Sequence, residues 1–292
     1  MTDTSQPVVL LTGASIGLGR VTAEVLSASG FSVFGTSRTP KPDPSRPYAM
    51  LPLDVRSDES VAACVQAVLE RTGRLDMLIN NAGFGLTGAI EEASLDQAKG
   101  LFETNFFGAV RMVQAVLPLM REQRRGTIVN VSSIGGIVAS PLRGFYSASK
   151  HALEGYTEAL RHEVKPFGIH VALVEPGVFQ SSFDAATQEP ARPLGAYAAL
   201  RQRAGAFFAD QIATGADPRA IAHVILRILR DPNPRLRHLV GADARMLALS
   251  KRTQPEALLE AQIRWIFRLD NRPLPEGLMR AGMRLFGVGR NR

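Results

Sequence analysis

The sequence predicts an α/β fold in which a doubly wound, parallel seven-stranded sheet is covered by helices on both faces. Two observations predict it. Short apolar runs alternate with stretches of helical period, which is typical of consecutive β-α-β units. The first six apolar runs are rich in Val, Ile and Leu and hardly alternate in polarity, which is typical of strands buried on both faces.

The expected elements follow one another along the chain. We expect strands at Val8–Thr12, Phe31–Gly35, Ala49–Asp54, Leu75–Asn80, Gly126–Ser132, His170–Glu175 and His238–Val240. Helical patterns lie near Gly17–Ser29, Glu59–Arg71, Leu95–Arg121 and Ala148–Lys165. From about Ser181 the pattern turns to helices rich in Ala, Arg and aromatic residues. We therefore expect a single domain over residues 1–292, with a core at 7–180 and a helical C-terminal cap at 181–292.

The composition is that of an ordinary globular protein. Of the 292 residues, 45% are apolar and 21% are charged, which is enough for a sizeable buried core. Cys64 is the only cysteine, so an internal disulfide is excluded. The N-terminal segment has no basic region, and its apolar run Val8–Leu11 is too short for a signal peptide or a membrane span. We expect a soluble, cytoplasmic protein.

The net charge of +7 raises the question of nucleic acid, but the arrangement of the basic residues argues against it. A nucleic-acid surface needs clustered Lys and Arg, preferably with aromatic residues between them. Here the basic residues are scattered, apart from an enrichment between Arg264 and Arg292. A solvated basic face is the simpler interpretation of this tail, and a helix lying on an anionic membrane surface is the alternative. The histidines show no metal-ligand spacing, so we expect no metal site.

A glycine-rich turn joins the first strand to the first helix. Gly13, Gly17 and Gly19 give the spacing G-x-x-x-G-x-G directly after strand Val8–Thr12. Glycines at such a junction let the backbone approach a pyrophosphate, and the helix N-terminus offers free N–H donors. The turn therefore predicts a dinucleotide site, with contacts from Gly13, Ser15, Ile16, Gly17, Leu18 and Gly19.

The end of the second strand indicates which dinucleotide is bound. An NAD site usually carries an acid here for the ribose 2′-hydroxyl, but the segment Phe31–Arg38 contains no acid, and the next one is Asp43. Ser37 and Arg38 instead offer a hydroxyl and a guanidinium, which suit a 2′-phosphate. We therefore expect NADP(H) to be preferred over NAD(H).

Tyr146 and Lys150 lie four residues apart in a helical stretch, which places both side chains on one helix face. A free phenol, with a pKa of about 10, is a poor base at neutral pH. A nearby ammonium and a positive nicotinamide ring both favour the phenolate, so the pair suggests a tyrosine acid/base.

These motifs together resemble one family. The segments Thr12–Gly19, Asn80–Gly83 and Tyr146–Lys150, with Asn105, Ser133 and the dipeptide Pro176-Gly177, stand in the order found in the short-chain dehydrogenase/reductases. The resemblance covers roughly residues 7–180 and is to the compact, non-extended branch, with steroid- and retinol-type members. It implies a Rossmann-type fold and an NADP-dependent oxidoreductase that interconverts a carbonyl and an alcohol, with the cap over the substrate. It also implies a homodimer or homotetramer.

The resemblance implies a role for each matched catalytic residue. Ser133 is expected to donate a hydrogen bond to the substrate oxygen, and Tyr146 to exchange the proton as general acid/base. Lys150 is expected to lower the pKa of Tyr146 and to hold the ribose hydroxyls. Asn105 is expected to anchor a water next to Lys150, or to cap a helix kink, or both. Because all four residues are present, catalysis is favoured over a binding-only role.

Further cofactor contacts are implied in the same way. Asp54 and Val55 are expected at the adenine, Asn81, Ala82 and Gly83 beneath the cofactor, and Pro176, Gly177, Val178 and Ser181 at the carboxamide. In the last element Ser181 stands where the family pattern P-G-x-x-x-T has Thr, so a hydroxyl is retained.

The expected substrate is a small hydrophobic ketone or secondary alcohol. Its walls are expected from residues 135–145, the loop after Gly83 and residues 179–211, which contribute mostly apolar side chains such as Phe183, Phe207 and Phe208. The alternative is that many of these side chains build the core of the cap itself. Arg143 and Arg201 are the candidates for meeting an acidic group, while the pair Glu91 and Glu92 is interpreted as helix N-terminal charge. Two other functions stay open: an NADP(H)-binding regulatory or scaffold protein without turnover, and an epimerase or dehydratase. The latter usually has a different glycine spacing and a larger C-terminal domain.

Overall fold

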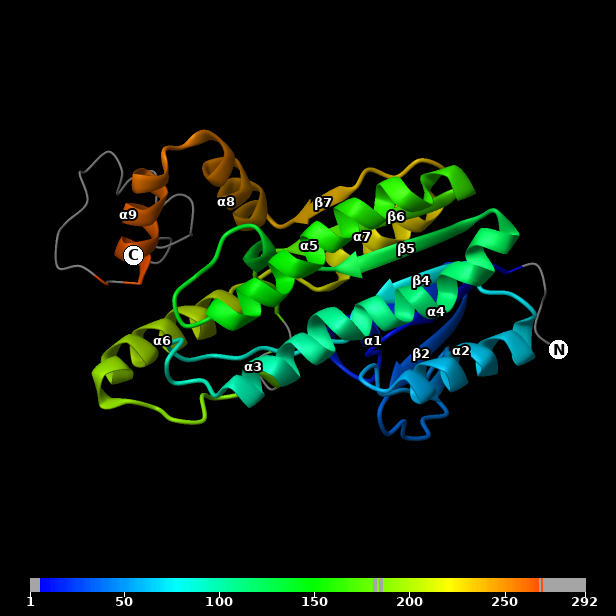
Figure 1. Ribbon diagram of the computed structural model, residues 1–292, viewed down its shortest axis with the longest axis horizontal. Coiled ribbons are helices and arrows are strands. Elements are labelled where there is room, and N and C mark those ends of the chain that lie inside the picture. The colour runs from blue at the N-terminus through cyan, green and yellow to red at the C-terminus, as the bar shows by residue number, and fades with distance from the viewer. Residues whose placement is uncertain (1–5, 181–182, 184–185, 268, 270–292) are drawn as a thin grey trace.

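The computed structural model describes residues 6–180, 183, 186–267 and 269. Its centre is a seven-stranded parallel sheet with the order β3-β2-β1-β4-β5-β6-β7 (Figure 1). The strands are β1 (Val8–Leu11), β2 (Ser32–Ser37), β3 (Ala49–Pro52), β4 (Met77–Asn80), β5 (Gly126–Val131), β6 (Ile169–Pro176) and β7 (Arg237–Val240). The predicted doubly wound Rossmann-type sheet is confirmed, and the strand order reverses beside β1, where such sheets bind their ligands.

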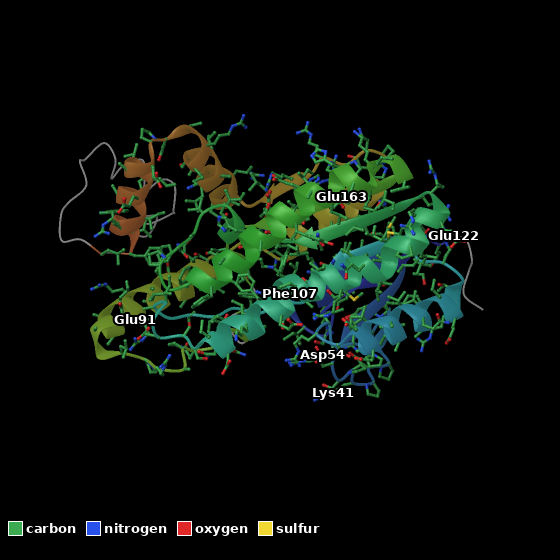
Figure 2. All side chains as sticks on the ribbon, viewed as in Figure 1. Lys41, Asp54, Glu91, Phe107, Glu122 and Glu163 are labelled. Atoms are coloured by element: carbon green, nitrogen blue, oxygen red, sulfur yellow. The ribbon has the colours of Figure 1, made fainter. Side chains whose placement is uncertain are left out.

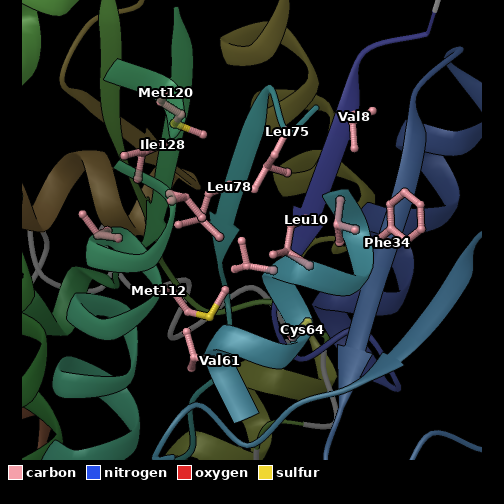
Figure 3. Packing of buried hydrophobic residues seen from close by; sticks show 14 of the residues in the cluster. Val8, Leu10, Phe34, Val61, Cys64, Leu75, Leu78, Met112, Met120 and Ile128 are labelled. Carbon is pink, nitrogen blue, oxygen red and sulfur yellow. The ribbon is translucent and has the colours of Figure 1, made fainter. Parts of the chain in front are cut away.

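Alternate residues of each central strand enter two separate hydrophobic cores. On one face Leu10 and Leu78 pack against α2 (Asp58–Thr72), α4 (Gly108–Gln123) and α5 (Gly144–Val164) (Figure 3). On the other face Leu11 and Ile79 pack against α1 (Gly17–Ala28) and α7 (Arg219–Arg230). All four strand residues named are fully buried. The lack of polar alternation in the sequence therefore reflects burial on both faces.

One expected helix is divided in the structure. The stretch expected at Leu95–Arg121 consists of α3 (Leu95–Phe102), a π-helical turn (Glu103–Phe107) and α4. The start of α3 is fixed by a capping box between Ser94 and Gln97. The helix expected from Ala148 begins at Gly144, so Tyr146 lies in the first turn of α5.

The segment after β6 contributes both to the core and to a cover over the sheet edge. Helix α7 and strand β7 belong to the core, and β7 pairs with β6. Residues 186–213, which include α6 (Ala198–Ala213), together with α8 (Ala242–Thr253) and α9 (Glu256–Ile266), form what is called the cap below. In Figure 1 the helices of the cap lie beyond the carboxyl ends of the strands. Within the described residues no helix has the length and apolarity needed to cross a membrane.

Candidate active site

A cavity of about 1180 Å³ runs along the carboxyl ends of the strands. One end is lined by the glycine-rich turn after β1 and by the end of β2, and the other end by the cap. Most of the residues expected to bind a cofactor line this cavity: Gly13, Ser15, Ile16, Gly17, Leu18, Gly19, Ser37, Arg38, Asp54, Val55, Asn81, Ala82, Gly83, Pro176, Gly177 and Val178. Ser181 lies outside the described residues.

The glycine-rich turn has the properties of a phosphate site. Gly13 and Gly17 have φ values of 69° and 57°, which residues with a Cβ rarely adopt. A Cβ on Gly19 would lie 2.0 Å from the carbonyl oxygen of Gly13, so only glycine fits there. Ile16 caps α1 without a side-chain hydrogen bond, and the first turn has no acidic residue. The first N–H groups of α1 are therefore not capped by a side chain, which suits an anion.

The residues after β2 form the polar end of the cavity. Ser37 Oγ is buried and has no hydrogen-bond partner among the described residues, so it has a hydroxyl available to a ligand. Arg38 is exposed at the strand end and forms no salt bridge within the described part of the chain. Lys41 and Asp54 lie at this end, as the side-chain view shows (Figure 2).

Asp54 is neutralised by a neighbour of its own loop. Its Oδ2 accepts a hydrogen bond from Arg56 Nη2 at 2.6 Å, and its Oδ1 accepts one from Arg56 Nε at 2.9 Å. These hydrogen bonds lower the pKa of Asp54 to about 2, against the effect of its partial burial. The expected contact with adenine therefore competes with Arg56.

The side chain of Asn81 forms hydrogen bonds to the backbone of the glycine-rich turn. Its Nδ2 donates to the carbonyl oxygens of Thr12 and Gly13 at 3.0 and 2.9 Å. In return, Thr12 Oγ1 accepts from the backbone N–H groups of Asn81 and Ala82, both at 2.9 Å. These four bonds tie the turn after β4 to the glycine-rich turn, so Asn81 shapes the floor of the cavity.

Tyr146, Ser133 and Lys150 meet in the middle of the cavity. Ser133 follows β5, and its Oγ accepts from Gly135 N at 3.0 Å. The ring of Tyr146 lies beside it, because a Cβ on Gly135 would lie 3.4 Å from Ser133 Oγ and 3.2 Å from Tyr146 Cε1. Lys150 Nζ donates to the Val131 carbonyl oxygen at 2.9 Å and lies 5.9 Å from the centre of the Tyr146 ring. Both side chains thus lie on one face of α5, as the spacing predicts.

The neighbouring hydroxyl of Ser132 has different surroundings. A Cβ placed on Gly136 would lie 2.8 Å from Ser132 Oγ and 3.2 Å from Glu154 Oε1. Ser132 Oγ therefore lies on the Glu154 side of this turn, whereas Ser133 is the serine beside Tyr146.

Burial governs the ionisation of both groups. It raises the pKa of Tyr146, and the hydrogen bond from Ser133 and the charge of Arg143 only partly oppose it. It lowers the pKa of Lys150 to about 8, against the negative charge of Glu154. The depressed phenol pKa expected from the sequence is therefore not produced by the side chains of the chain alone.

Asn105 occupies the π-helical turn between α3 and α4 and is 2% exposed. Its Oδ1 accepts from Phe84 N at 3.0 Å, and its Nδ2 donates to the Phe84 carbonyl at 2.9 Å and to Ser149 Oγ at 3.3 Å. Asn105 is thus buried at a helix irregularity, but its side chain bonds to Phe84 and Ser149 and does not cap the helix. The π turn carries the side chain into the space between the β4 loop and α5.

The turn after β6 is held by a residue that the sequence did not indicate. Asp243 Oδ2 in the first turn of α8 accepts from Val178 N at 2.7 Å, and a Cβ on Gly177 would lie only 2.1 Å from the same oxygen. Gly177 N also donates to the Val240 carbonyl at 2.8 Å. No local pattern in the sequence links Asp243 to this turn, because the contact joins segments 65 residues apart.

The cap lines the far end of the cavity with apolar side chains. Phe183, Phe207 and Phe208 were expected there, but Ile263, Ile266 and Phe267 from the end of α9 line it too. Phe267 packs against Phe207 and Phe208 with ring centres 5.4 and 5.8 Å apart. The contribution of α9 was missed because nothing in its sequence distinguishes a pocket wall from a packed helix face.

The two arginines proposed to meet an acidic group differ in the structure. Arg201 pairs with Glu92, a fully buried carboxylate in the loop after β4, so it is used within the protein. The interpretation of Glu92 as helix N-terminal charge is therefore wrong. Arg143 lines the cavity, and its guanidinium lies over the Phe208 ring at 3.7 Å.

Comparison with known proteins agrees with this geometry. The family model described as short chain dehydrogenase matches residues 7–192. A 3-ketodihydrosphingosine reductase from Bacteroides thetaiotaomicron is 41% identical over 265 residues, covering 90% of this chain and 98% of that protein. Retinol dehydrogenase 8 from Bos taurus is 36% identical over 216 residues, covering 71% and 68%. The crystal structure of a short-chain dehydrogenase from Streptomyces avermitilis is similar with a TM-score of 0.77 and 36% identity, covering 91% of this chain and 99% of that one. The chain therefore belongs to the short-chain dehydrogenase/reductase family of oxidoreductases.

Proposed function

We propose that the protein is an NADP(H)-dependent oxidoreductase that interconverts a ketone and a secondary alcohol on a long, apolar substrate, with Tyr146 as general acid/base. One observation carries the proposal. Tyr146 and Ser133 lie side by side in a continuous cavity, between a phosphate site at one end and the apolar wall of the cap at the other.

The residues present fit a nicotinamide dinucleotide. The glycine-rich turn and the start of α1 would hold the pyrophosphate, and Lys150 would hold the ribose of the nicotinamide end. When bound, the nicotinamide supplies or accepts the hydride and, in its oxidised form, adds a positive charge beside Tyr146.

The proton is transferred by side chains of the protein itself. Ser133 and Tyr146 lie beside each other at Gly135 and both line the cavity, so both hydroxyls can contact a single substrate oxygen. In reduction Tyr146 protonates that oxygen, and in oxidation its phenolate removes the alcohol proton. Because burial raises the pKa of Tyr146, the ammonium of Lys150 is needed to stabilise the phenolate.

Two features favour NADP(H) over NAD(H). Arg38 and the unsatisfied hydroxyl of Ser37 lie together where a 2′-phosphate would be bound. Asp54, the acid at this end of the cavity, is paired with Arg56 and so does not present an uncompensated negative charge to the phosphate.

A long-chain ketone is the substrate class that the cap favours. The aromatic cluster of Phe207, Phe208 and Phe267 offers an apolar wall rather than groups that would bind a sugar. The relative that is 41% identical is named a 3-ketodihydrosphingosine reductase. We extend a ketone substrate from that name to this chain, and the apolar wall of the cap favours a ketone with a long apolar chain.

The first experiment follows oxidation of NADPH and NADH with a series of long-chain 3-ketones and short ketones. We expect turnover with NADPH and a long-chain ketone, and a loss of about 1000-fold or more in Tyr146→Phe, because general acid/base catalysis contributes about 100- to 10,000-fold. Tyr156→Phe is the matched control, since Tyr156 is on the same helix and does not line the cavity. NADPH binding without turnover of any substrate would instead support the regulatory function.

A second variant tests the cofactor preference. Arg38→Ala is expected to raise the KM for NADPH by about 10- to 150-fold, because a hydrogen bond to a charged group is worth about 1.5–3 kcal/mol. The KM for NADH should change little. Equal effects on both cofactors would refute the assignment of Arg38 to the 2′-phosphate.

A further inference from the structure

Two buried carboxyl groups near Lys150 have no role in the reaction proposed above. Glu154 is one turn after Lys150 on α5, and Glu175 lies on β6. Their side chains are 7% and 0% exposed. Both bond to the same nitrogen, Nη1 of Arg237 at the start of β7, whose Nη2 bonds to the half-exposed Glu158.

The guanidinium of Arg237 is therefore the ion-pair partner of three carboxylates, those of Glu154, Glu158 and Glu175. Within the described residues, Glu154 Oε1 and Glu175 Oε2 are buried and have no hydrogen-bond partner. Burial and the charge of Glu154 raise the pKa of Glu175 well above the usual carboxyl range, and Arg237 only partly opposes this. Even when Glu175 is protonated, Glu154 and Glu158 together carry more negative charge than the single guanidinium of Arg237 compensates, so a further cation next to Glu154 is stabilised.

Lys150 is that cation. It lies one turn before Glu154 on the same face of α5 and is itself buried, and the negative charge of Glu154 opposes the lowering of its pKa by burial. The charged and titratable groups around Lys150 and Glu154 come from several elements: Arg143 at the N-cap of α5, Tyr146 and Glu158 on α5, Glu175 on β6 and Arg237 on β7. Glu103, in the π-helical turn packed against α5, is paired with Arg111 at 2.5 Å. Without Glu154, burial would act on the Lys150 ammonium unopposed by a neighbouring carboxylate.

We propose that Glu154 is a positioning residue that keeps Lys150 charged at neutral pH and thereby sets the pH at which Tyr146 exchanges its proton. Glu175 and Arg237 hold the Glu154 carboxylate in place. The effect on Tyr146 rests on the proposed function, whereas the effect on Lys150 does not.

The direct test is the titration of Lys150 itself in the full-length protein. With lysine labelled with ¹³C at the ε-carbon, the Lys150 signal is assigned by its loss in Lys150→Arg. In Glu154→Gln we expect the pKa of Lys150 to fall from about 8 to about 7, because a neighbouring opposite charge shifts a pKa by about one or more.

Glu158→Gln is the matched control, because Glu158 lies on the same helix and bonds to the same Arg237 but is one turn farther from Lys150. It should leave the Lys150 titration unchanged. If Lys150 titrates at the same pH in wild type and in Glu154→Gln, or if both variants shift it equally, the proposal is wrong. Should Glu154→Gln fail to fold, Glu154→Met removes the same charge without burying an unpaired amide, and it must lower the pKa of Lys150 in the same direction; no change there would overturn the proposal.

A second readout uses alcohol oxidation with cofactor as a function of pH. Because neutral Lys150 no longer stabilises the phenolate, Glu154→Gln should move the rise of kcat to higher pH, and Glu154→Asp, which retains the charge, should restore most of the wild-type profile. Glu158→Gln should leave the profile in place. A shifted Lys150 titration in a protein that turns over no alcohol would support the role of Glu154 and refute the proposed function.

Discussion

Glu92 connects the core to the cap, and its replacement by Gln probes that connection. The carboxylate is fully buried, and its Oε2 accepts from Ala89 N at 2.8 Å on the core side. Its Oε1 accepts from Leu194 N at 2.6 Å and from the guanidinium of Arg201, both in the cap. Burial by itself would raise the pKa of Glu92, but the two backbone N–H bonds and Arg201 together lower it. The stability that ionised Glu92 contributes is therefore fully present at any pH above the ordinary carboxyl pKa. It is lost only as the pH falls through the lowered pKa that Glu92 has in the folded state.

The free-energy cost of Glu92→Gln follows from the three donors that bond to the carboxylate, namely Ala89 N, Leu194 N and the Arg201 guanidinium. Whichever way the Gln amide is turned, its NH₂ group faces an N–H donor and leaves it without an acceptor. A buried unsatisfied group costs about 1–3 kcal/mol, and the bond to Arg201 loses its charge assistance, so we expect about 3 kcal/mol in total. This corresponds to a roughly 100-fold increase in the population with the cap segment released.

Hydrogen exchange measures that release. The N–H groups of Arg192 and Leu194 donate to the carbonyl and carboxylate oxygens of Glu92, so both should exchange about 100-fold faster in Glu92→Gln, while the amides of β5 stay unchanged. The KM of the substrate should rise along with this exchange. The control is Glu91→Gln, because the Glu91 carboxylate bonds to Tyr197 at the exposed surface (Figure 2). Equal exchange at Leu194 in wild type and Glu92→Gln would refute the reasoning.

Three more variants test other parts of the structure. Gly19→Ala should abolish cofactor binding, measured by quenching of protein fluorescence with NADPH, because the added Cβ would lie 2.0 Å from the Gly13 carbonyl oxygen and 2.6 Å from Asn81 Nδ2. Arg237→Met should lower stability by about 3 kcal/mol at pH 8, since it leaves two buried carboxylates uncompensated and the 37% exposure of the arginine moderates the cost. In Arg237→Met the two buried glutamates bind protons more tightly in the folded state than in the unfolded state, so the variant gains stability as the pH falls. The loss in Tm relative to wild type should therefore be smaller at pH 5 than at pH 8. An equal loss at both pH values would contradict this explanation. Phe208→Ala should raise the KM of a long-chain ketone while leaving that of a short ketone within about threefold, and a parallel change for both would argue against a chain-binding wall.

The features that the sequence predicted well depend on local pattern. The central strands and the glycine-rich turn are encoded in consecutive residues, since burial on both faces demands apolar runs and positive φ demands glycine at Gly13 and Gly17. Tyr146 and Lys150 also lie within one helix, where spacing fixes their common face. For such features the sequence and the physics of one segment are sufficient.

The features that it missed depend on contacts between distant segments. The division of the helix at Glu103–Phe107 follows from the packing of Asn105 against Phe84, which no helical period reveals. The pairing of Glu92 with Arg201 joins residues 109 apart, so the acid was mistaken for helix N-terminal charge. Glu154 carried a usable signal, because a glutamate four residues after an expected active-site lysine lies on the same helix face.

The cofactor end of the cavity is built from backbone contacts and the substrate end from side-chain contacts. This difference explains why the sequence predicts the type of reaction better than it predicts the substrate. At the cofactor end Gly19 and Asn81 are fixed by backbone contacts within the sheet core, so little else fits there. At the substrate end the wall comes from α6 and α9, which join the core largely through side chains such as Arg201. Side-chain contacts of this kind can be exchanged without disturbing the sheet, so a cap of this type can change its substrate while Tyr146 and Lys150 keep their places. Substrate choice should therefore respond to substitutions in α6 and α9, and cofactor choice to substitutions at the end of β2, independently of each other.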